Sequence, residues 1–311
     1  MVGLLFPGQG SQFPGMGREL AAAFPAARAV FQEADDVLGE RLSALCWNGP
    51  DADLVATRNA QPAILVHSLA VLRVLGNEIG PVVAAAGHSL GEFSAWVAAG
   101  SLGFADAVRT VRLRGELMQR SGVDRPGTMA AILGLDDGVL EQVCRDATRG
   151  GGECVAANYN SPGQLVVSGD VAAVERAMEL ARAAGARRVV LLNVSGAFHS
   201  PLMQVAQAGL QAWLETLSLA PPAFPVVSNV TAEAVSDVGE ARVLLVRQLT
   251  SPVRWGASMR TMLAAGIADF FELGPGNVLT GLLRRIERTA RATAVGGPAE
   301  IAALRPEGRS S

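Results

Sequence analysis

The sequence predicts an α/β fold, in which a parallel sheet covered by helices carries an inserted βαββαβ unit of the ferredoxin-like type. Half of the 311 residues are hydrophobic and only 18% are charged, which supplies a large core and excludes a disordered chain. Short apolar runs alternate with longer segments of helical period, as parallel α/β proteins require. The rhythm changes between about residues 126 and 194, and this change predicts the insertion.

The N-terminal third predicts two strands that each end in a glycine-rich turn. Val2–Phe6 is a buried apolar run that ends in Gly8-Gln9-Gly10. Val82–Ala86 is a second such run, and it leads into Gly87-His88-Ser89-Leu90-Gly91. The remaining segments of this region have helical period and predict helices at 16–39, 60–76, 89–99 and 104–121.

The middle of the chain predicts four strands and two helices in the order βαββαβ. Asp136 and Asp170 are placed to cap helices that run to about Thr148 and to Ala184, and Gly185 follows as a helix stop signal. The predicted strands of this unit are 128–134, 154–157, 164–168 and 188–194.

The α/β pattern then resumes. It predicts helices at about 200–217, 239–249, 255–265 and 277–290. It predicts strands at 225–228 and 269–273. We therefore expect residues 1–125 and 195–297 to form the core and 126–194 the small subdomain. Residues 298–311 are rich in Pro, Gly, Ser and Arg and are expected to be a frayed tail.

Composition excludes several classes of function. All 26 basic residues are arginine, which excludes Schiff-base and P-loop lysine chemistry. A net charge of −3 argues against a nucleic-acid partner, and three scattered cysteines with no ligand spacing argue against a metal. The start of the chain lacks a signal-peptide pattern, and no apolar run of 18 residues occurs. We expect a soluble cytoplasmic monomer that does not contact membranes.

Gly87-x-Ser89-x-Gly91 has the pattern of a nucleophile elbow between a strand and a helix. Its glycines allow a tight turn that raises a serine hydroxyl above the sheet edge, and the helix start adds N–H donors. The alternative is a chance GxSxG in a chain with 35 glycines. The strand before the motif and the helix after it favour the catalytic interpretation.

A serine nucleophile needs a base, and the chain has three histidines. His88 is adjacent to Ser89 in a tight turn and should point away from it, whereas His67 lies in a helical run and is expected to be buried or capping. His199 remains as the best candidate base. The N–H of Leu90 and the Gly8-Gln9-Gly10 turn are candidates for an oxyanion hole, although that turn could also be a plain turn.

Arg114 falls on the apolar stripe of the helix predicted over 104–121, three residues after Val111 and four before Met118. A guanidinium that faces a core needs a partner. That partner is either an internal acid or the carboxylate of a substrate, which arginine binds in bidentate fashion. Spacing alone favours the internal acid, and a neighbouring serine nucleophile favours the substrate.

Together these motifs resemble one family, the malonyl-CoA:acyl-carrier-protein transacylases, which include acyltransferase domains of fatty-acid and polyketide synthases. The resemblance covers about residues 3–290 in family order. The matching motifs are Phe6-Pro7-Gly8-Gln9-Gly10-Ser11-Gln12, Gln61-Pro62-Ala63, Gly87-His88-Ser89-Leu90-Gly91-Glu92, Arg114-Gly115, Met118-Gln119, Asn158-Tyr159-Asn160-Ser161-Pro162-Gly163-Gln164, Gly196-Ala197-Phe198-His199-Ser200, Ser251-Pro252-Val253-Arg254-Trp255 and Glu272-Leu273-Gly274-Pro275-Gly276. The family fold, a hydrolase-like α/β core with a ferredoxin-like insertion, agrees with the fold predicted above.

The resemblance implies a role for each matching residue. Ser89 would carry the acyl ester, with His199 as its base and Arg114 as the site for the free malonyl carboxylate. In this family a main-chain carbonyl orients the histidine. The matching stretch here is Ser251–Trp255, and within it we expect Arg254 to supply that carbonyl. The remaining implied residues are Gln9 and Leu90 as oxyanion donors, Gln61 and Asn160 near the site, and Phe198, which would disfavour a branched methylmalonyl group.

The implied reaction is a ping-pong transfer of malonyl from malonyl-CoA to the phosphopantetheine thiol of an acyl carrier protein, with no cofactor. Carrier proteins are acidic, so a basic rim is expected, although we interpret at least half of its candidates as ordinary solvated surface. These candidates are Arg187, Arg188, Arg284, Arg285 and Arg288.

Three alternatives stay open. A serine esterase or thioesterase would use water in place of the carrier thiol, but it gives Arg114 no role and needs an acid that the sequence does not place. A non-catalytic binding module would not need Ser89, His199 and Arg114 together. A free-standing acyltransferase of a polyketide synthase would carry nearly the same motifs.

Overall fold

The larger sheet is built from strands at both ends of the chain. The computed structural model describes residues 1–304. The strand order is β10-β9-β1-β2-β7-β8, and every described pair is parallel except the hairpin of β7 with β8. These strands are β1 (Val2–Phe6), β2 (Val82–Gly87), β7 (Val226–Val227), β8 (Ala234–Val235), β9 (Asp269–Leu273) and β10 (Arg291–Val295). The predicted α/β class is confirmed, with β1 and β2 side by side at its centre.

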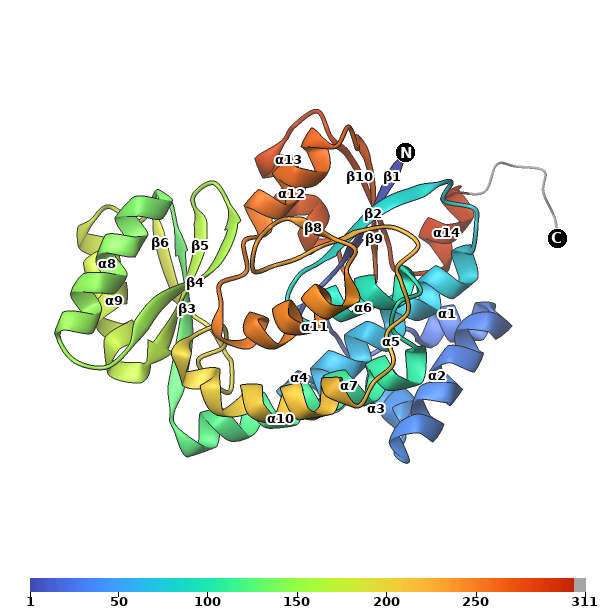
Figure 1. Cartoon of the computed structure of the whole chain (residues 1–311), viewed down its shortest axis with the longest axis horizontal. Coiled ribbons are helices and arrows are strands. Elements are labelled where there is room, and N and C mark those ends of the chain that lie inside the picture. Colours follow the sequence, from blue (N-terminus) through green and yellow to red (C-terminus); the bar gives the residue numbers. More distant parts are fainter. Residues whose placement is uncertain (305–311) are drawn as a thin grey trace.

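Helices cover both faces of this sheet (Figure 1). Successive side chains of β1 point to opposite faces, so Leu4 and Phe6 join one core while Leu5 joins the other. The second core also holds α12 and α13. The helices of the larger domain are α1 (Arg18–Ala23), α2 (Pro25–Leu38), α3 (Leu42–Asn48), α4 (Asp51–Val55), α5 (Thr57–Leu75), α6 (Gly91–Ala98), α7 (Phe104–Asp124), α10 (Gln204–Glu215), α11 (Val238–Arg247), α12 (Trp255–Ala264), α13 (Val278–Ile286) and α14 (Pro298–Leu304), with 3₁₀ turns η1 (Pro201–Met203) and η2 (Gln248–Thr250).

Helix α5 runs through the centre of the larger domain, and most of its side chains are buried around its whole circumference. It packs tightly against α7 where a glycine permits close contact. A Cβ placed on Gly115 would lie 2.7 Å from the Cα of Arg58. This close approach brings Arg114 of α7 next to Gln61 of α5.

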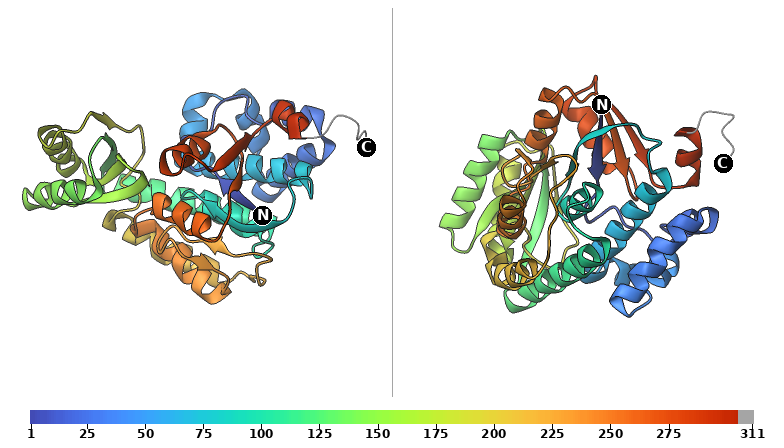
Figure 2. Two further views of the ribbon diagram at one scale, coloured as in Figure 1. Left: turned by 90° about the horizontal axis from the view of Figure 1, so that it is seen from above. Right: turned by 45° about the vertical axis from the view of Figure 1, so that its right-hand side comes forward.

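Residues 127–191 form the small subdomain, with its own apolar core. Its antiparallel sheet has the order β4-β5-β3-β6, which confirms the ferredoxin-like βαββαβ prediction. Figures 1 and 2 show this sheet and its two helices projecting to one side of the larger domain. The elements are β3 (Gly127–Leu133), α8 (Asp137–Arg149), β4 (Cys154–Ser161), β5 (Gln164–Asp170), α9 (Val171–Ala183) and β6 (Arg188–Leu191).

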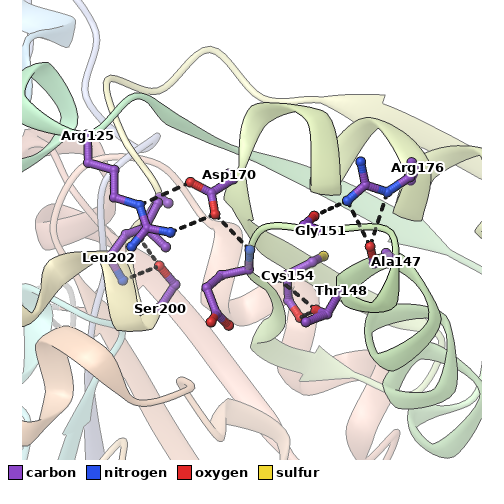
Figure 3. Close-up of polar contacts among 11 residues, drawn as sticks. Arg125, Ala147, Thr148, Gly151, Cys154, Asp170, Arg176, Ser200 and Leu202 are labelled. Carbon is purple, nitrogen blue, oxygen red and sulfur yellow. Dashed lines mark hydrogen bonds and ion pairs between the residues drawn. The ribbon is translucent and has the colours of Figure 1, made fainter.

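Asp136 and Asp170 occupy the predicted N-cap positions of α8 and α9, but neither side chain makes a capping hydrogen bond. The Asp170 carboxylate instead accepts hydrogen bonds from Nε and Nη2 of Arg125, at 3.1 and 2.8 Å, and from the main-chain N–H of Glu153. Figure 3 shows Arg125 reaching Asp170. Arg125 lies between α7 and β3, so this pair ties one connection between the domains to the subdomain.

Several predicted boundaries differ from the structure. The helix predicted over 16–39 is two helices, because the chain is extended at Phe24 and Pro25 begins α2. The frayed tail predicted from residue 298 is wrong for residues 298–304, since these form α14 and Ile301 is fully buried. Residues 305–311 of that tail lie outside the described residues. Helices α3 and α4 and strands β8 and β10 were not predicted from the sequence.

None of the helices described over residues 1–304 is both long and apolar enough to cross a membrane.

Candidate active site

A cavity of about 410 Å³ lies between the larger domain and the small subdomain. The larger domain contributes the turn after β1, the turn after β2, Arg114 of α7 and the start of α13. The subdomain contributes β3, β4 and β5, and the returning chain contributes Phe198 and His199. The carboxyl ends of parallel strands are the usual place for ligands in such sheets.

Ser89 stands in a strained turn between β2 and α6. Its φ of 52° is in the left-handed region, which non-glycine residues rarely adopt outside functional sites. Any residue larger than glycine would clash at the two flanking positions. A Cβ on Gly87 would lie 1.9 Å from the main chain of Gly91, and a Cβ on Gly91 would lie 2.2 Å from the Phe6 oxygen. The turn therefore has the geometry that the GxSxG pattern predicts.

His199 meets Ser89 across a separation of 110 residues. Its Nε2 lies 2.8 Å from Ser89 Oγ, and its Nδ1 lies 2.8 Å from the main-chain oxygen of Gln248. An Nδ1–H that donates to this carbonyl leaves Nε2 as the acceptor for the serine O–H. His199 also has a left-handed φ, of 58°. The pair is thus aligned for proton transfer without a carboxylate partner.

His199 is neutral in this environment. Burial lowers its pKa to about 3, and the positive charge of Arg114 adds to this effect. An uncharged imidazole can accept a proton from a serine hydroxyl, so the site keeps its base in the active form at neutral pH.

The expectation for Arg254 is corrected. The carbonyl that accepts from His199 Nδ1 belongs to Gln248, and the main chain of Ser251 adds only a smaller effect on the His199 pKa. The Arg254 side chain lies in a different hollow, with its guanidinium 6.0 Å from the centre of the Tyr159 ring. Gln248 begins the 3₁₀ turn η2 and is fully buried, whereas Arg254 lies beyond that turn and lines the other hollow.

Gln9 and Leu90 both line the cavity with Ser89. Leu90 immediately precedes α6, where the first amide N–H groups of a helix have no acceptor within it. The Gln9 side chain is held aside by α5, since its Nε2 donates to Thr57 Oγ1 at 3.2 Å. The structure thus brings the two predicted oxyanion donors to the wall that holds the serine.

Arg114 is 1% exposed and its guanidinium reaches the serine. Nη2 donates to Ser89 Oγ at 3.1 Å and to Gln248 Oε1 at 2.8 Å, while Nη1 donates to Gln61 Oε1 at 2.7 Å. The Nε has no hydrogen-bond partner among the described residues. Burial lowers the pKa of Arg114 to about 10, and the nearby Glu92 opposes that shift, so the group remains a cation at neutral pH.

Sequence reasoning missed three polar residues behind this site: Glu92, Asn229 and Gln248. All are at most 1% exposed and are hydrogen-bonded to one another. Gln248 lies in a 3₁₀ turn with no motif of its own, and no signal in the sequence could have identified its carbonyl. Glu92 belongs to the quoted GHSLGE motif, where its charge next to a buried elbow was an available signal.

The other predicted residues divide between the cavity and its support. Phe198 and Asn160 line the cavity, and Asn160 Oδ1 accepts from His88 Nε2 at 2.8 Å. Gln61 lies behind the wall, where it binds Arg114. His88 is thus held by Asn160, away from a base role, as the sequence analysis expects.

His67 is buried in α5, where its Nε2 donates to the Gly296 oxygen at 2.7 Å, and burial lowers its pKa to about 4. In the unfolded chain the pKa of His67 is about 6.5, so the unfolded chain binds a proton that the folded chain rejects, and stability falls as pH drops below that value. We expect His67→Gln to reduce the difference in the free energy of unfolding between about pH 7.5 and about pH 5 by roughly 2 kcal/mol. Urea denaturation of both proteins at the two pH values measures this.

The remaining buried groups titrate alike in wild type and His67→Gln, so their contributions cancel in the comparison. An identical pH dependence in the two proteins would show that His67 does not stay neutral on folding.

The site combines a strained serine, a neutral imidazole oriented by a carbonyl and a buried cation beside the serine hydroxyl. The serine and the neutral imidazole are the catalytic groups that enzymes with an acyl-serine intermediate use. The fold and the site therefore define the class of serine-dependent acyl-transfer enzymes.

Comparisons with known proteins identify the family. The sequence profile of the acyl transferase domain matches residues 4–309, and the chain belongs to the acyl transferase domain family. It is 45% identical over 300 residues to a malonyl CoA-acyl carrier protein transacylase of Bacillus subtilis (strain 168), covering 96% of this chain and 95% of the relative. Identity to the transacylase of the same description from Escherichia coli (strain K12) is 44% over 301 residues, covering 96% and 97%.

Solved structures agree over the whole fold. An acyl carrier protein S-malonyltransferase from Vibrio cholerae O1 biovar eltor has a TM-score of 0.94 at 42% identity, covering 98% of this chain and 99% of the other. A malonyl-transacylase solved in complex with its type II PKS acyl-carrier protein has a TM-score of 0.93 at 42% identity, covering 97% and 98%.

Proposed function

We propose that the protein is a malonyl-CoA:[acyl-carrier-protein] S-malonyltransferase of fatty-acid synthesis, in which Ser89 is the nucleophile, His199 the base and Arg114 the carboxylate site. The observation that carries the proposal is the buried Arg114 guanidinium, 3.1 Å from Ser89 Oγ. A neutral acyl group on Ser89 would leave this cation without a partner from the substrate. A malonyl group would bring a free carboxylate to it, and guanidinium–carboxylate pairs are strong when buried. The shared description of the full-length relatives supports the same substrate.

The first half-reaction loads the enzyme. His199 Nε2 takes the Ser89 proton as Oγ attacks the thioester carbonyl carbon of malonyl-CoA, and the negative charge on the carbonyl oxygen faces the N–H groups of Gln9 and Leu90. The C–S bond then breaks, the CoA sulfur takes the proton from His199, and malonyl remains as an ester on Ser89. The Gln248 carbonyl holds His199 Nδ1 throughout, which keeps Nε2 aimed at the reacting oxygens.

The second half-reaction reverses these steps with another thiol. His199 removes the proton of the phosphopantetheine thiol of the carrier protein, and the sulfur attacks the malonyl ester. Ser89 leaves with the proton and malonyl becomes a thioester on the carrier. The reaction needs no cofactor, since the thioester supplies the activated acyl group.

Phe198 supports selectivity for an unbranched acyl group. It lines the cavity immediately before His199 and is buried. An α-methyl branch on the acyl chain would need the space that this ring fills, so we propose that methylmalonyl is disfavoured.

The acidic carrier protein approaches the mouth of the cavity. Arg285 lies on α13, whose first residues line the cavity, and its Nη1 donates to Gln164 Oε1 at 2.7 Å. We assign Arg285 to the carrier contact. The other exposed candidates on this rim are interpreted as solvated surface.

The enzyme is proposed to act as a cytoplasmic monomer, with residues 1–125 and 195–297, extended by α14, as its catalytic core. One chain supplies every residue of the site, which supports the monomer. The three cysteines are free and buried, which is consistent with a reducing compartment.

A thioesterase or esterase and a polyketide-synthase acyltransferase remain the alternatives. The experiment is intact-mass measurement of the protein with malonyl-CoA, followed by holo or apo carrier protein. We expect a malonyl adduct that persists with apo carrier, which lacks the thiol, and moves to holo carrier. An adduct that decays equally fast with either carrier would show hydrolysis. A marked preference for a polyketide carrier over a fatty-acid carrier would assign the other pathway.

A further inference from the structure

Glu92 is a carboxylate buried behind the nucleophile that touches none of the reacting atoms. It lies three residues after Ser89 in the first turn of α6 and is 1% exposed. Its Oε2 accepts two hydrogen bonds, from Gln248 Nε2 at 2.7 Å and from the main-chain N–H of Asn229 at 3.0 Å. Burying a carboxylate costs free energy, so the presence of Glu92 and its two hydrogen bonds at this position needs an explanation.

The hydrogen bond from Gln248 Nε2 to Glu92 contributes to the orientation of the Gln248 side-chain amide. Gln248 Oε1 accepts from Arg114 Nη2 at 2.8 Å, while its Nε2 donates to Glu92 and to the Ser89 oxygen. A reversed amide would turn its NH₂ group toward the guanidinium, where two donors would face each other. Glu92 opposes this reversal together with the Ser89 oxygen, since the reversed amide would also set its oxygen against the carboxylate and the carbonyl.

The hydrogen bond from the Asn229 main-chain N–H to Glu92 supports the turn that carries Ser89. The Asn229 side chain connects the two sides of that turn: Oδ1 accepts from the Ser89 N–H at 2.7 Å, and Nδ2 donates to the Gly87 oxygen at 2.7 Å. Glu92 accepts from the main-chain N–H of the same residue. One carboxylate oxygen therefore connects the serine turn with the residue that binds both His199 and Arg114.

We propose that Glu92 is a positioning residue, whose Oε2 fixes the Gln248 amide so that Arg114 is held where the malonyl carboxylate binds. This inference rests on the proposed function and extends it to selectivity among acyl groups. Glu92 acts through Gln248, so its main effect falls on substrates that need Arg114. Burial raises the pKa of Glu92 to about 7, and a proton on Oε1 would leave Oε2 able to accept both bonds.

The test compares two substitutions of similar size. Glu92→Gln offers an amide oxygen in place of Oε2, whereas Glu92→Met offers no acceptor. The readout is the ratio of the acylation rate constants for malonyl-CoA and acetyl-CoA, measured by intact mass without carrier. Any loss of folded protein affects both rates equally and cancels in the ratio.

We expect Glu92→Gln to keep the ratio within about threefold of wild type and Glu92→Met to lower it by at least about tenfold. A Glu92→Met ratio equal to wild type would reduce Glu92 to a structural role and overturn the proposal. An equal loss in both variants would attribute the effect to charge rather than to the acceptor, and would overturn it as well.

Two further measurements complete the design. If Glu92→Met does not fold, Glu92→Asp takes its place, because a carboxylate shorter by one methylene cannot reach Gln248 Nε2 and should lower the ratio similarly. Because Glu92 acts through Gln248, Glu92→Met should lower the ratio no further in a Gln248→Leu background. A wild-type enzyme that fails to prefer malonyl-CoA would overturn the proposed function itself, which separates the two failures.

Discussion

The Ser89→Ala enzyme should form no malonyl adduct, and its transfer rate should fall by at least about 10⁴-fold. The reason is chemical, since the malonyl ester forms on Ser89 Oγ and alanine has no atom that can attack the thioester. The substitution should leave the fold intact, because the two glycines that permit the turn remain. Intact mass after incubation with malonyl-CoA measures the adduct, and transfer to holo carrier protein measures the rate.

Ser94→Ala is the matched control. Ser94 lies on α6, the helix that follows the Ser89 turn, is fully buried and has an Oγ without a hydrogen-bond partner among the described residues. Its removal should leave loading close to wild type. A persistent adduct in Ser89→Ala would place the acyl group on another residue and refute the proposed mechanism.

Replacing Arg114 by alanine should lower the rate of malonyl loading by about 10²- to 10³-fold and acetyl loading far less. The malonyl carboxylate would then enter a buried site without its cationic partner, whereas an acetyl group has no charge to lose. Arg114→Lys should recover only part of the loss, since an ammonium cannot replace the planar fork that binds Gln61 and Gln248 together. Rates of adduct formation with malonyl-CoA and acetyl-CoA give the comparison.

Arg112→Ala controls for the loss of a buried arginine from α7. Arg112 is 9% exposed, binds Asn59 and Glu40, and lies outside the cavity, so it should alter stability without changing acyl selectivity. Equal losses for malonyl and acetyl in Arg114→Ala would mean that the guanidinium supports the serine or the structure rather than the carboxylate.

Local spacing was sufficient to predict much of the site. Gly87 and Gly91 are the residues that a strand-to-helix turn demands, and the helical period of 104–121 placed Arg114 on the buried face. His199 was identified because only three histidines exist. These arguments work because steric restrictions on a turn and the period of a helix act over a few residues.

The Arg254 prediction failed for a different physical reason. Every residue carries the same main-chain carbonyl, so nothing in a side-chain motif identifies which carbonyl faces an imidazole. That choice depends on how α11 ends and how η2 turns the chain toward His199, which places Gln248 there. The matched family motif, Ser251–Trp255, begins just after the residue that supplies the carbonyl and does not contain it.

The predicted tail and the missed strand β10 show the same limit. The segment over 291–304 is short and mixed in polarity, and it has order because β9 offers an unpaired edge and a core pocket receives Ile301. A short strand or helix gains little stability alone, and most of it comes from what it packs against.

The sequence by itself determined the α/β class, the ferredoxin-like insertion, the serine turn and the buried arginine, since each follows from the order of residues close together in the chain. Only the tertiary structure decided that Gln248 orients His199, that Gln61 and Gln248 hold Arg114, and that Glu92 and Asn229 lie behind Ser89. Hydrogen bonds such as that from Asn229 to Glu92 join residues 137 apart. A buried polar group must find a partner, but which partner it finds is decided by the packing of the whole chain.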